Sequence, residues 1–190
     1  MSQRQSVSRE RIEQFLRRLG EIFRHPARIY LVGGTTLVYE GFREQSLDVD
    51  LTFTVADAHH AELVRAIREL KDALSINIEE VSPADFIPLP SGYAERAQFV
   101  GRYGQLNVFH FDLYSVALSK IERGSQLDFA DVLALLQSSR IAMDSLQRYF
   151  DEISVRYGEQ SLRQDPVRFR RNFDVVKQAW ANLKSAMEIQ

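Results

Sequence analysis

Several features are missing from this sequence, and each absence narrows what the protein can be. Its 190 residues contain no cysteine, which excludes disulfide bonds and thiol chemistry. The 24 lysines and arginines are balanced by 26 aspartates and glutamates, so the net charge of −2 provides no general basic field for nucleic acid, although a local patch stays open. No signal peptide, long apolar run or internal repeat occurs. We therefore expect a cytoplasmic protein that does not enter a membrane.

What is present is organised around residues 29–53, where the pattern predicts a strand, a glycine turn, a short helix, a loop and a second strand. Because side chains alternate along a strand, the second strand has an apolar and a polar face. The α-carbons of Asp48 and Asp50, both on the polar face, would lie about 7 Å apart. Two carboxylates this close repel each other, so they are either solvated or hold a cation. Oxygen-only ligands suit Mg²⁺ or Mn²⁺.

The glycine turn supports the same interpretation. Gly33 and Gly34 end the first strand, and a helix can begin near Thr35. Glycine lets the backbone approach a ligand, and the free N–H groups of a first helical turn form an anion site. A phosphate there, facing a metal held by Asp48 and Asp50, would make a nucleotide site. The alternative is a simple tight turn beside an exposed strand edge, but the two halves in this order favour the nucleotide site.

The pattern of Val32–Thr35 followed by Asp48–Leu51 resembles the signature of the polymerase-beta-like nucleotidyltransferase superfamily. That signature is hydrophobic-Gly-Gly/Ser, a spacer, and Asp-hydrophobic-Asp/Glu-hydrophobic. The resemblance implies an α+β fold with a mixed sheet flanked by helices. It also implies that Asp48 and Asp50 bind a metal. The turn residues Gly33, Gly34 and Thr35 would bind phosphate.

A third carboxylate is expected, because in a two-metal site the attacking oxygen must also meet a metal. Asp112 follows a predicted strand at residues 106–111 and is our candidate. It precedes a predicted helix at residues 113–123, so it is equally well placed to cap that helix. The sequence leaves both roles open.

The run at residues 111–124 and 127–132 resembles a downstream motif of proteins related to the AbiEii-type toxins of bacterial type IV toxin–antitoxin and phage-defence systems. The resemblance implies that Lys120 contacts a nucleotide phosphate and that Asp128 approaches the active site, with Asp131 one turn further on. It also implies a cognate toxin or antitoxin partner. The alternative is a surface lysine paired with one of these aspartates. Together the two resemblances cover roughly residues 29–136.

The remaining segments are expected to be mostly helical. Ser8 and Asp57 can cap helices at residues 9–24 and 57–74, and residues 76–79 alternate like a strand. Residues 82–103 predict an ordered loop packed on the sheet, which either lines a substrate pocket or caps the core. Further helices are expected at residues 127–136, at 143–157, and from Pro166 onward. The polar groups of the loop that could face a substrate are Tyr93, Arg96 and Arg102.

Two features near the chain ends have modest interpretations. The last helix carries an apolar stripe that could dock on the body or on a second copy of the chain, a homodimer: Phe169, Phe173, Val176, Trp180, Leu183 and Met187. Arg168, Arg170 and Arg171 near its start are expected on a solvated face rather than on nucleic acid. The histidines His25, His59 and His60 are expected at the surface.

These observations favour an enzyme that moves a nucleoside monophosphate from a nucleoside triphosphate to a hydroxyl of RNA such as tRNA, of protein or of a small molecule. The alternative is a catalytically silent binding module, an antitoxin or other partner. A metal-dependent glycosyltransferase fits less well, and a dinucleotide-binding dehydrogenase is excluded because no Gly-x-Gly-x-x-Gly follows a strand. We expect a core at residues 1–138 and a helical extension at 139–190 packed on it.

Overall fold

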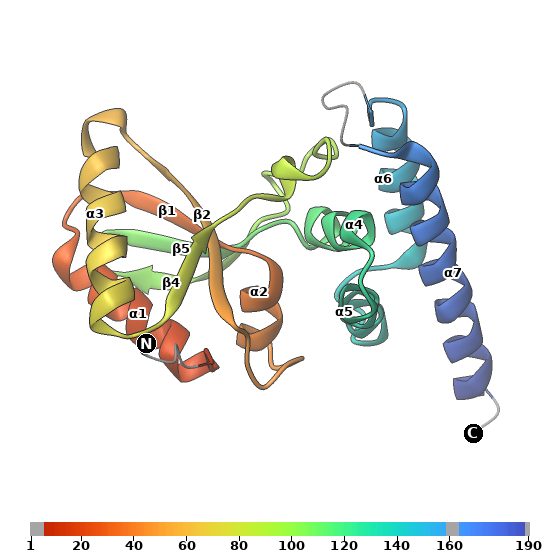
Figure 1. Ribbon diagram of the computed structural model, residues 1–190, viewed down its shortest axis with the longest axis horizontal. Helices are drawn as coiled ribbons and strands as arrows, with labels where there is room; N and C mark the ends of the chain where they lie inside the picture. Colours follow the sequence, from red (N-terminus) through yellow and green to blue (C-terminus); the bar gives the residue numbers. More distant parts are fainter. Residues whose placement is uncertain (1–5, 159–163, 189–190) are drawn as a thin grey trace. The chain divides into compact units, whose positions relative to one another are not determined.

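The computed structural model describes residues 6–158 and 164–188 (Figure 1). The chain divides into two compact units, each described separately below. The first contains the chain up to Ser82 together with Ala97–Phe111, and the second contains Pro83–Arg96 together with the chain from Asp112 onward. The helices after Phe111, which the sequence grouped with the sheet, cluster with the C-terminal helices by their contacts.

The first unit is built on a mixed five-stranded sheet, which confirms the α+β class. Its strand order is β3-β2-β1-β5-β4. β1 is antiparallel to β2 and parallel to β5, β2 is parallel to β3, and β4 is antiparallel to β5. The strands and helices of this unit are β1 (Ala27–Leu31), β2 (Asp48–Val55), β3 (Asn77–Glu80), β4 (Gln98–Tyr103), β5 (Leu106–His110), α1 (Arg9–Ile22), α2 (Gly33–Tyr39) and α3 (Asp57–Ala73).

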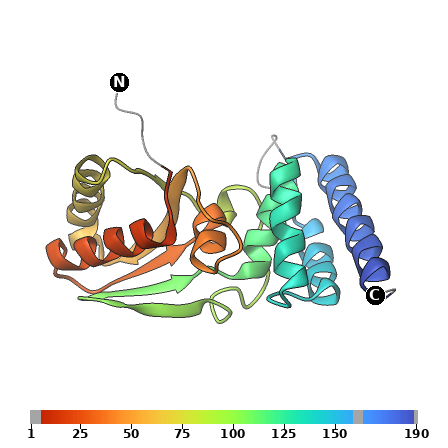
Figure 2. The ribbon, with the colours of Figure 1, turned by 90° about the horizontal axis from the view of Figure 1, so that it is seen from below.

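The core of this unit lies between one face of the sheet and the helices α1 and α3, which are on the same side (Figure 2). Apolar residues recur at helical spacing in both helices, so each presents a continuous apolar stripe. Alternate residues of the strands meet these stripes, as the period of two requires. The central buried side chains are Phe15, Leu16, Leu19, Ile29, Leu31, Val49, Leu51, Leu63, Leu70 and Val108.

Three local expectations for the chain from the start of α3 to β5 were wrong. Ala56 occupies the N-cap position of α3, and Asp57 lies in its first turn. β4 forms inside the stretch that was expected to be a loop, because it pairs with β5. Its own sequence pattern did not predict a strand, since the pairing is irregular, with a register shift between Phe99 and Gly101. The loop before β4 belongs to the helical unit, where Ser91 hydrogen-bonds Glu152.

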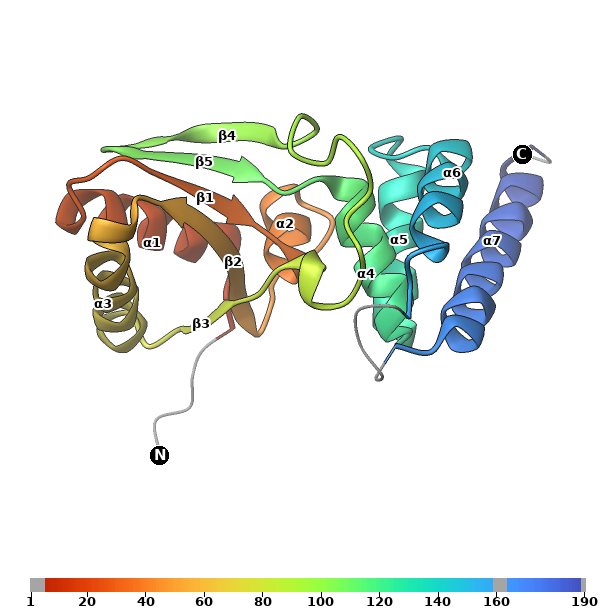
Figure 3. The ribbon, with the colours of Figure 1, turned by 90° about the horizontal axis from the view of Figure 1, so that it is seen from above.

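The second unit is helical, with α4 (Leu113–Arg123), α5 (Gln126–Gln137), α6 (Met143–Ser154), α7 (Pro166–Glu188) and a 3₁₀ turn at Pro83–Asp85 (Figure 3). Its aromatic core stacks Phe150 on Phe173 at 4.0 Å between ring centroids, with Phe169 beside Phe150 at 4.7 Å. The first half of the α7 stripe is therefore buried. Further along, Trp180 and Leu183 are half-buried and Met187 is 61% exposed.

The start of α7 agrees with the sequence, in which Asp165, a residue type that can cap a helix, precedes a proline suited to the first turn. The Asp165 carboxylate accepts hydrogen bonds from the N–H groups of Val167 and Arg168, each at 3.0 Å, and Pro166 occupies the first turn. Arg168 pairs with Glu122, and Arg170 lies near Asp151. Two of the three arginines near this helix start are thus engaged by acids of the same unit. In the parts of the chain described above, no helix is both long and apolar enough to cross a membrane.

We expect Asp165→Ala to lower the free energy of unfolding by about 1 kcal/mol, because it removes the acceptor for two N–H groups of the first turn of α7. Urea unfolding followed by circular dichroism measures this loss. Asp174→Ala is the matched control, since Asp174 is an exposed acid inside the same helix. Equal losses in the two variants would contradict the capping role.

Candidate functional site

The turn between β1 and α2 is fastened directly to the carboxylate-bearing strand β2. The Gly34 N–H donates to Asp50 Oδ2 at 3.1 Å, and the Asp50 N–H donates to Thr35 Oγ1 at 2.6 Å. The Val32 N–H donates to the Asp50 carbonyl at 3.1 Å. Thr35 is fully buried. The start of α2 and the position of Asp50 are therefore set by the same hydrogen bonds.

Three carboxylates gather on the open side of the sheet next to this turn. Asp48 and Asp50 lie on one face of β2, as their spacing predicted, and Glu79 lies opposite Asp50 on the parallel strand β3. One oxygen from each lies within 4.8 Å of the others. The Asn77 side-chain amide donates to Asp48 and, at 3.0 Å, to Glu79, so it holds two of the three in place.

This donor set fits a hard divalent cation. It offers only oxygen, it is partly solvated, and without a cation it would concentrate three negative charges. The Gly34 N–H, at the positive end of α2, offsets part of this charge at Asp50. Mg²⁺ or Mn²⁺ is the ion such oxygens favour.

Glu79 was not identified from the sequence. The alternation at residues 76–79 predicted a strand, but nothing in the sequence indicated which strand it would join. Its register, with Asp48 opposite Asn77 and Asp50 opposite Glu79, comes from parallel pairing between segments separated by the whole of α3. A useful signal would have been that both strands carry an acid on the face opposite their buried valine or isoleucine, Val49 and Ile78.

The two glycines of the turn are required for different reasons. Gly33 has φ +54°, and a Cβ built there would lie 2.5 Å from Asp50 Oδ2. A Cβ at Gly34 would lie 2.8 Å from Ser46 Oγ. The backbone of the turn therefore approaches the carboxylate closely, as the sequence suggested for a ligand-binding turn. Phosphate binding by Gly33, Gly34 and Thr35 stays a prediction.

Asp112 belongs to the second unit, where it caps α4. Its carboxylate accepts hydrogen bonds from the N–H groups of Tyr114 and Ser115 and from the Ser115 hydroxyl, and it receives both Nε and an Nη of Arg96 at 2.9 Å. Asp112 is 1% exposed. The hydrogen bond to Asp112 raises the pKa of Arg96. The cap is thus in place, and a metal-binding role for Asp112 stays a prediction.

Lys120 and Asp128 meet within the second unit, together with Asp131. The Lys120 ammonium lies 2.7 Å from Asp131 Oδ2 and 3.4 Å from Asp128 Oδ1, and all three residues are buried. Arg123 and Ser125 also bond the Asp128 carboxylate. The structure therefore contains the lysine–aspartate pairing, but inside the helical unit rather than at the surface. Nucleotide contacts by Lys120 and Asp128 stay predictions.

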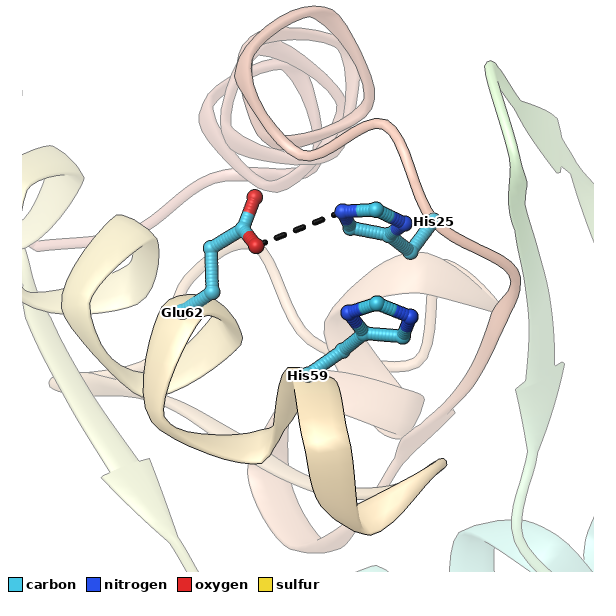
Figure 4. Close-up of side chains that lie close together, drawn as sticks. All are labelled: His25, His59 and Glu62. Atoms are coloured by element: carbon cyan, nitrogen blue, oxygen red, sulfur yellow. Dashed lines mark ion pairs between the residues drawn. The ribbon is translucent and has the colours of Figure 1, made fainter.

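The histidines near α3 form a second group, which the sequence did not link. The rings of His25 and His59 stack at 3.6 Å between centroids with only 9° between their planes, and His25 Nε2 lies 3.3 Å from Glu62 (Figure 4). A nitrogen lone pair lies in the plane of its ring, so two parallel rings cannot aim their lone pairs at one ion between them. In this arrangement the three side chains join the end of α1 to the start of α3.

The mixed sheet and the carboxylates beside a Gly-Gly turn agree with the nucleotidyltransferase-like proteins that the sequence resembles. A family model matches residues 10–181, and the chain belongs to that family, described as "Nucleotidyltransferase of unknown function (DUF6036)". This bears out the resemblance at the level of the nucleotidyltransferase superfamily, while the closer likeness to AbiEii-type toxins stays a prediction. Searches of curated proteins and of solved structures gave no match.

We expect Gly33→Ala to lower the affinity for Mn²⁺ about tenfold, because its Cβ would displace the Asp50 carboxylate. Titration followed by electron paramagnetic resonance measures the bound ion without requiring catalysis. Gly41→Ala is the matched control, since Gly41 also has a positive φ, +81°, but a Cβ there meets nothing within 4 Å. Both variants carry the strain of a side chain at positive φ, roughly 1 kcal/mol, and only Gly33→Ala should lose affinity for the ion. Equal ion affinities would contradict the geometry.

We expect stability to fall as the pH drops below about 4, in part through Asp128. Burial alone would raise the pKa of Asp128, but the hydrogen bonds of Arg123 and Ser125 and the charge of Lys120 outweigh burial and lower it. As the pH falls, the Asp128 carboxylate is therefore protonated first in the unfolded chain. Its contribution to the free energy of unfolding is complete above its pKa in the unfolded chain. That contribution is lost as the pH falls through its lower pKa in the folded protein.

Urea unfolding of the wild type and of Asp128→Asn at several pH values from 5 to 3 tests this. The variant cannot titrate at this position, so its stability should fall less over the window. Asp144→Asn, which alters an exposed acid of α6, should follow the wild type. Parallel curves for the wild type and Asp128→Asn would exclude the assigned shift.

Proposed function

We propose that the protein is a divalent-metal-dependent nucleotidyltransferase that moves a nucleoside monophosphate from a nucleoside triphosphate to a hydroxyl acceptor. The acceptor oxygen attacks the α-phosphorus, the bond to the bridging oxygen breaks, pyrophosphate leaves, and the hydroxyl proton passes to solvent. The single observation that carries the proposal is the meeting of three carboxylates from β2 and β3 beside the Gly-Gly start of α2. Membership of a nucleotidyltransferase family supports the same reaction.

In this proposal Asp48, Asp50 and Glu79 hold the ions. Bound Mg²⁺ would offset charge on the α-phosphate and lower the pKa of the attacking hydroxyl. The fixed backbone of the turn orients Asp50, so its carboxylate needs no rearrangement when an ion arrives. The N–H groups of Gly33 and Thr35, on either side of the one that bonds Asp50, are the candidates for the β- and γ-phosphates.

Glu79 and Glu80 offer a sharp test because they are neighbours on β3, and Glu79 is the one opposite Asp50 on the carboxylate face. We expect Glu79→Gln to reduce nucleotidyl transfer at least a hundredfold and Glu80→Gln to leave it within about twofold. The assay incubates each protein with Mg²⁺, cell extract and one α-labelled nucleoside triphosphate at a time. Asp48→Asn and Asp50→Asn should also be inactive.

Two outcomes would overturn the proposal. One is labelling by the wild type that the Asp48, Asp50 and Glu79 variants retain in full. The other is no labelling with any of the four nucleotides, together with no thermal stabilisation of the wild type by nucleotide and Mg²⁺.

The alternative, a catalytically silent binding module, is favoured by the second half of α7. Val175 is 47% exposed, Met187 is 61% exposed, and Trp180 and Leu183 are only half-buried. A partner or a second copy of the chain that covered this surface would stabilise the protein where nucleotide does not. Thermal shift with nucleotide and Mg²⁺, compared with a co-purifying partner, separates the two functions. A toxin–antitoxin role is part of this alternative, and testing that role requires the partner to be identified.

A further inference from the structure

The face of the sheet opposite α1 and α3 is organised in three cross-strand rows, which we call the acidic, aromatic and basic rows of the open face. Strand register defines them, because residues paired across neighbouring strands share a face. The acidic row is Glu79 and Asp50 with Asp48 beside them. The aromatic row is Thr52, Tyr30, Phe109 and Phe99. The basic row is Thr54, Arg28, Asn107 and Arg102.

The aromatic row runs across the sheet from Tyr30 on β1, beside the carboxylate-bearing strand β2, to Phe99 on the edge strand β4. Tyr30 and Phe109 lie 5.6 Å apart between ring centroids with 27° between their planes, and Phe99 meets Phe109 edge-on at 5.5 Å. Phe99 is 62% exposed, although it lies on the edge strand β4. Edge strands often carry charges that discourage association, whereas here an exposed phenylalanine continues a row of two further rings, which makes the row a candidate ligand surface. Aromatic rings on a sheet are suited to stacking nucleobases.

The basic row has charge that its surroundings do not neutralise. Within the described part of the chain, neither Arg28 nor Arg102 has an acidic partner, and Arg102 donates only to the Gly104 carbonyl at 3.1 Å and the Gln105 side chain at 3.5 Å. Both arginines are exposed. An open hollow of about 360 Å³ is lined by Arg28, Thr54 and Asn107 and by residues of the adjoining strand ends. Guanidinium and hydroxyl donors around a hollow suit a phosphate group.

We propose that the open face binds the acceptor and that the acceptor is the end of a single-stranded nucleic acid. The terminal hydroxyl lies at the acidic row, a base stacks on the aromatic row at Phe99, and a backbone phosphate meets the basic row. Along β2 the acidic and basic rows are about 13 Å apart, since Asp50 and Thr54 are separated by four residues. Phe99 and Arg102 lie on β4, three strands and about 14 Å across the sheet from β2, so a strand of a few nucleotides would cross the face from the acidic row to these residues. This inference rests on the proposed function, and it specifies the substrate of the same site.

The order of the rows is what favours nucleic acid over a protein or a small acceptor. A nucleotide strand offers in sequence a hydroxyl, a flat base and an anionic phosphate, and the face offers an ion site, exposed rings and uncompensated guanidinium groups. A duplex fits poorly because its base faces are already stacked on one another. The net charge of −2 predicts modest affinity, with the interaction confined to this patch.

Fluorescence anisotropy with a labelled eight-nucleotide single strand, as RNA and as DNA, tests the proposal without requiring catalysis. We expect Phe99→Leu, which keeps an apolar side chain but removes the ring, to weaken binding about tenfold, and Phe99→Trp to retain it. The double variant Arg28→Gln with Arg102→Gln should weaken binding and flatten the dependence on salt. The slope of log K against log salt should change by about 1.4 if each arginine contacts one phosphate.

Arg65→Gln, compared with Arg28→Gln alone, is the control for loss of one charge. It removes an exposed charge from α3, on the other side of the sheet, and should leave binding unchanged. Equal binding of the RNA and DNA strands would mean that the ribose hydroxyl is not read, and preference for RNA would identify the acceptor as RNA. Either result supports the proposal if the Phe99 and arginine variants bind less.

The failure of this inference and the failure of the proposed function are separate results. Nucleotide transfer to a protein or a small molecule, with no binding of either single strand, would overturn the nucleic-acid acceptor and leave the reaction standing. Binding of a strand that depends on Phe99 and the arginines, without transfer, would leave the surface standing and remove the reaction. Binding equally weakened by Arg65→Gln would indicate general charge attraction and would overturn the assigned face.

Discussion

The hydrogen bonds that join the Gly-Gly turn to Asp50 are the constraint on which the rest of the first unit depends. They set the position of one carboxylate with respect to the start of α2, and through β2 they set Asp48 as well. Pairing of β2 with β3 then brings Glu79 alongside. These carboxylates form a candidate site for a divalent ion, and backbone hydrogen bonds rather than flexible side chains fix the position of Asp50 within it.

This arrangement also explains how three acids can be tolerated together. Like charges at such separations raise one another's energy, and the cost is reduced by donors aimed at them. The Gly34 N–H and the Asn77 amide are these donors, one from a helix start and one from a strand. A bound ion would complete the compensation, and the aromatic and basic rows continue the same face of the sheet beyond the acids.

The second unit shows how a sequence motif can carry structural as well as chemical meaning. Asp112 and Lys120 both lie in a stretch that resembles a functional motif, yet each is buried with several partners of its own unit. Breaking such buried pairs leaves an uncompensated charge and costs several kcal/mol, so loss of activity on mutating them would not by itself indicate catalysis. The acids on β2 and β3 are partly solvated, so this ambiguity is smaller for them.

Much of the local structure could be predicted from the sequence, because it depends on short-range physics. The alternation in β2, the apolar stripes of α1 and α7, and the Asp165-Pro166 start are properties of consecutive residues. They determined the α+β class and the shared face of Asp48 and Asp50. The strand β4, the contribution of Glu79 and the three rows of the open face were decided only by tertiary structure. Strand pairing joins segments far apart in the chain, and no local pattern states which edge a strand will choose.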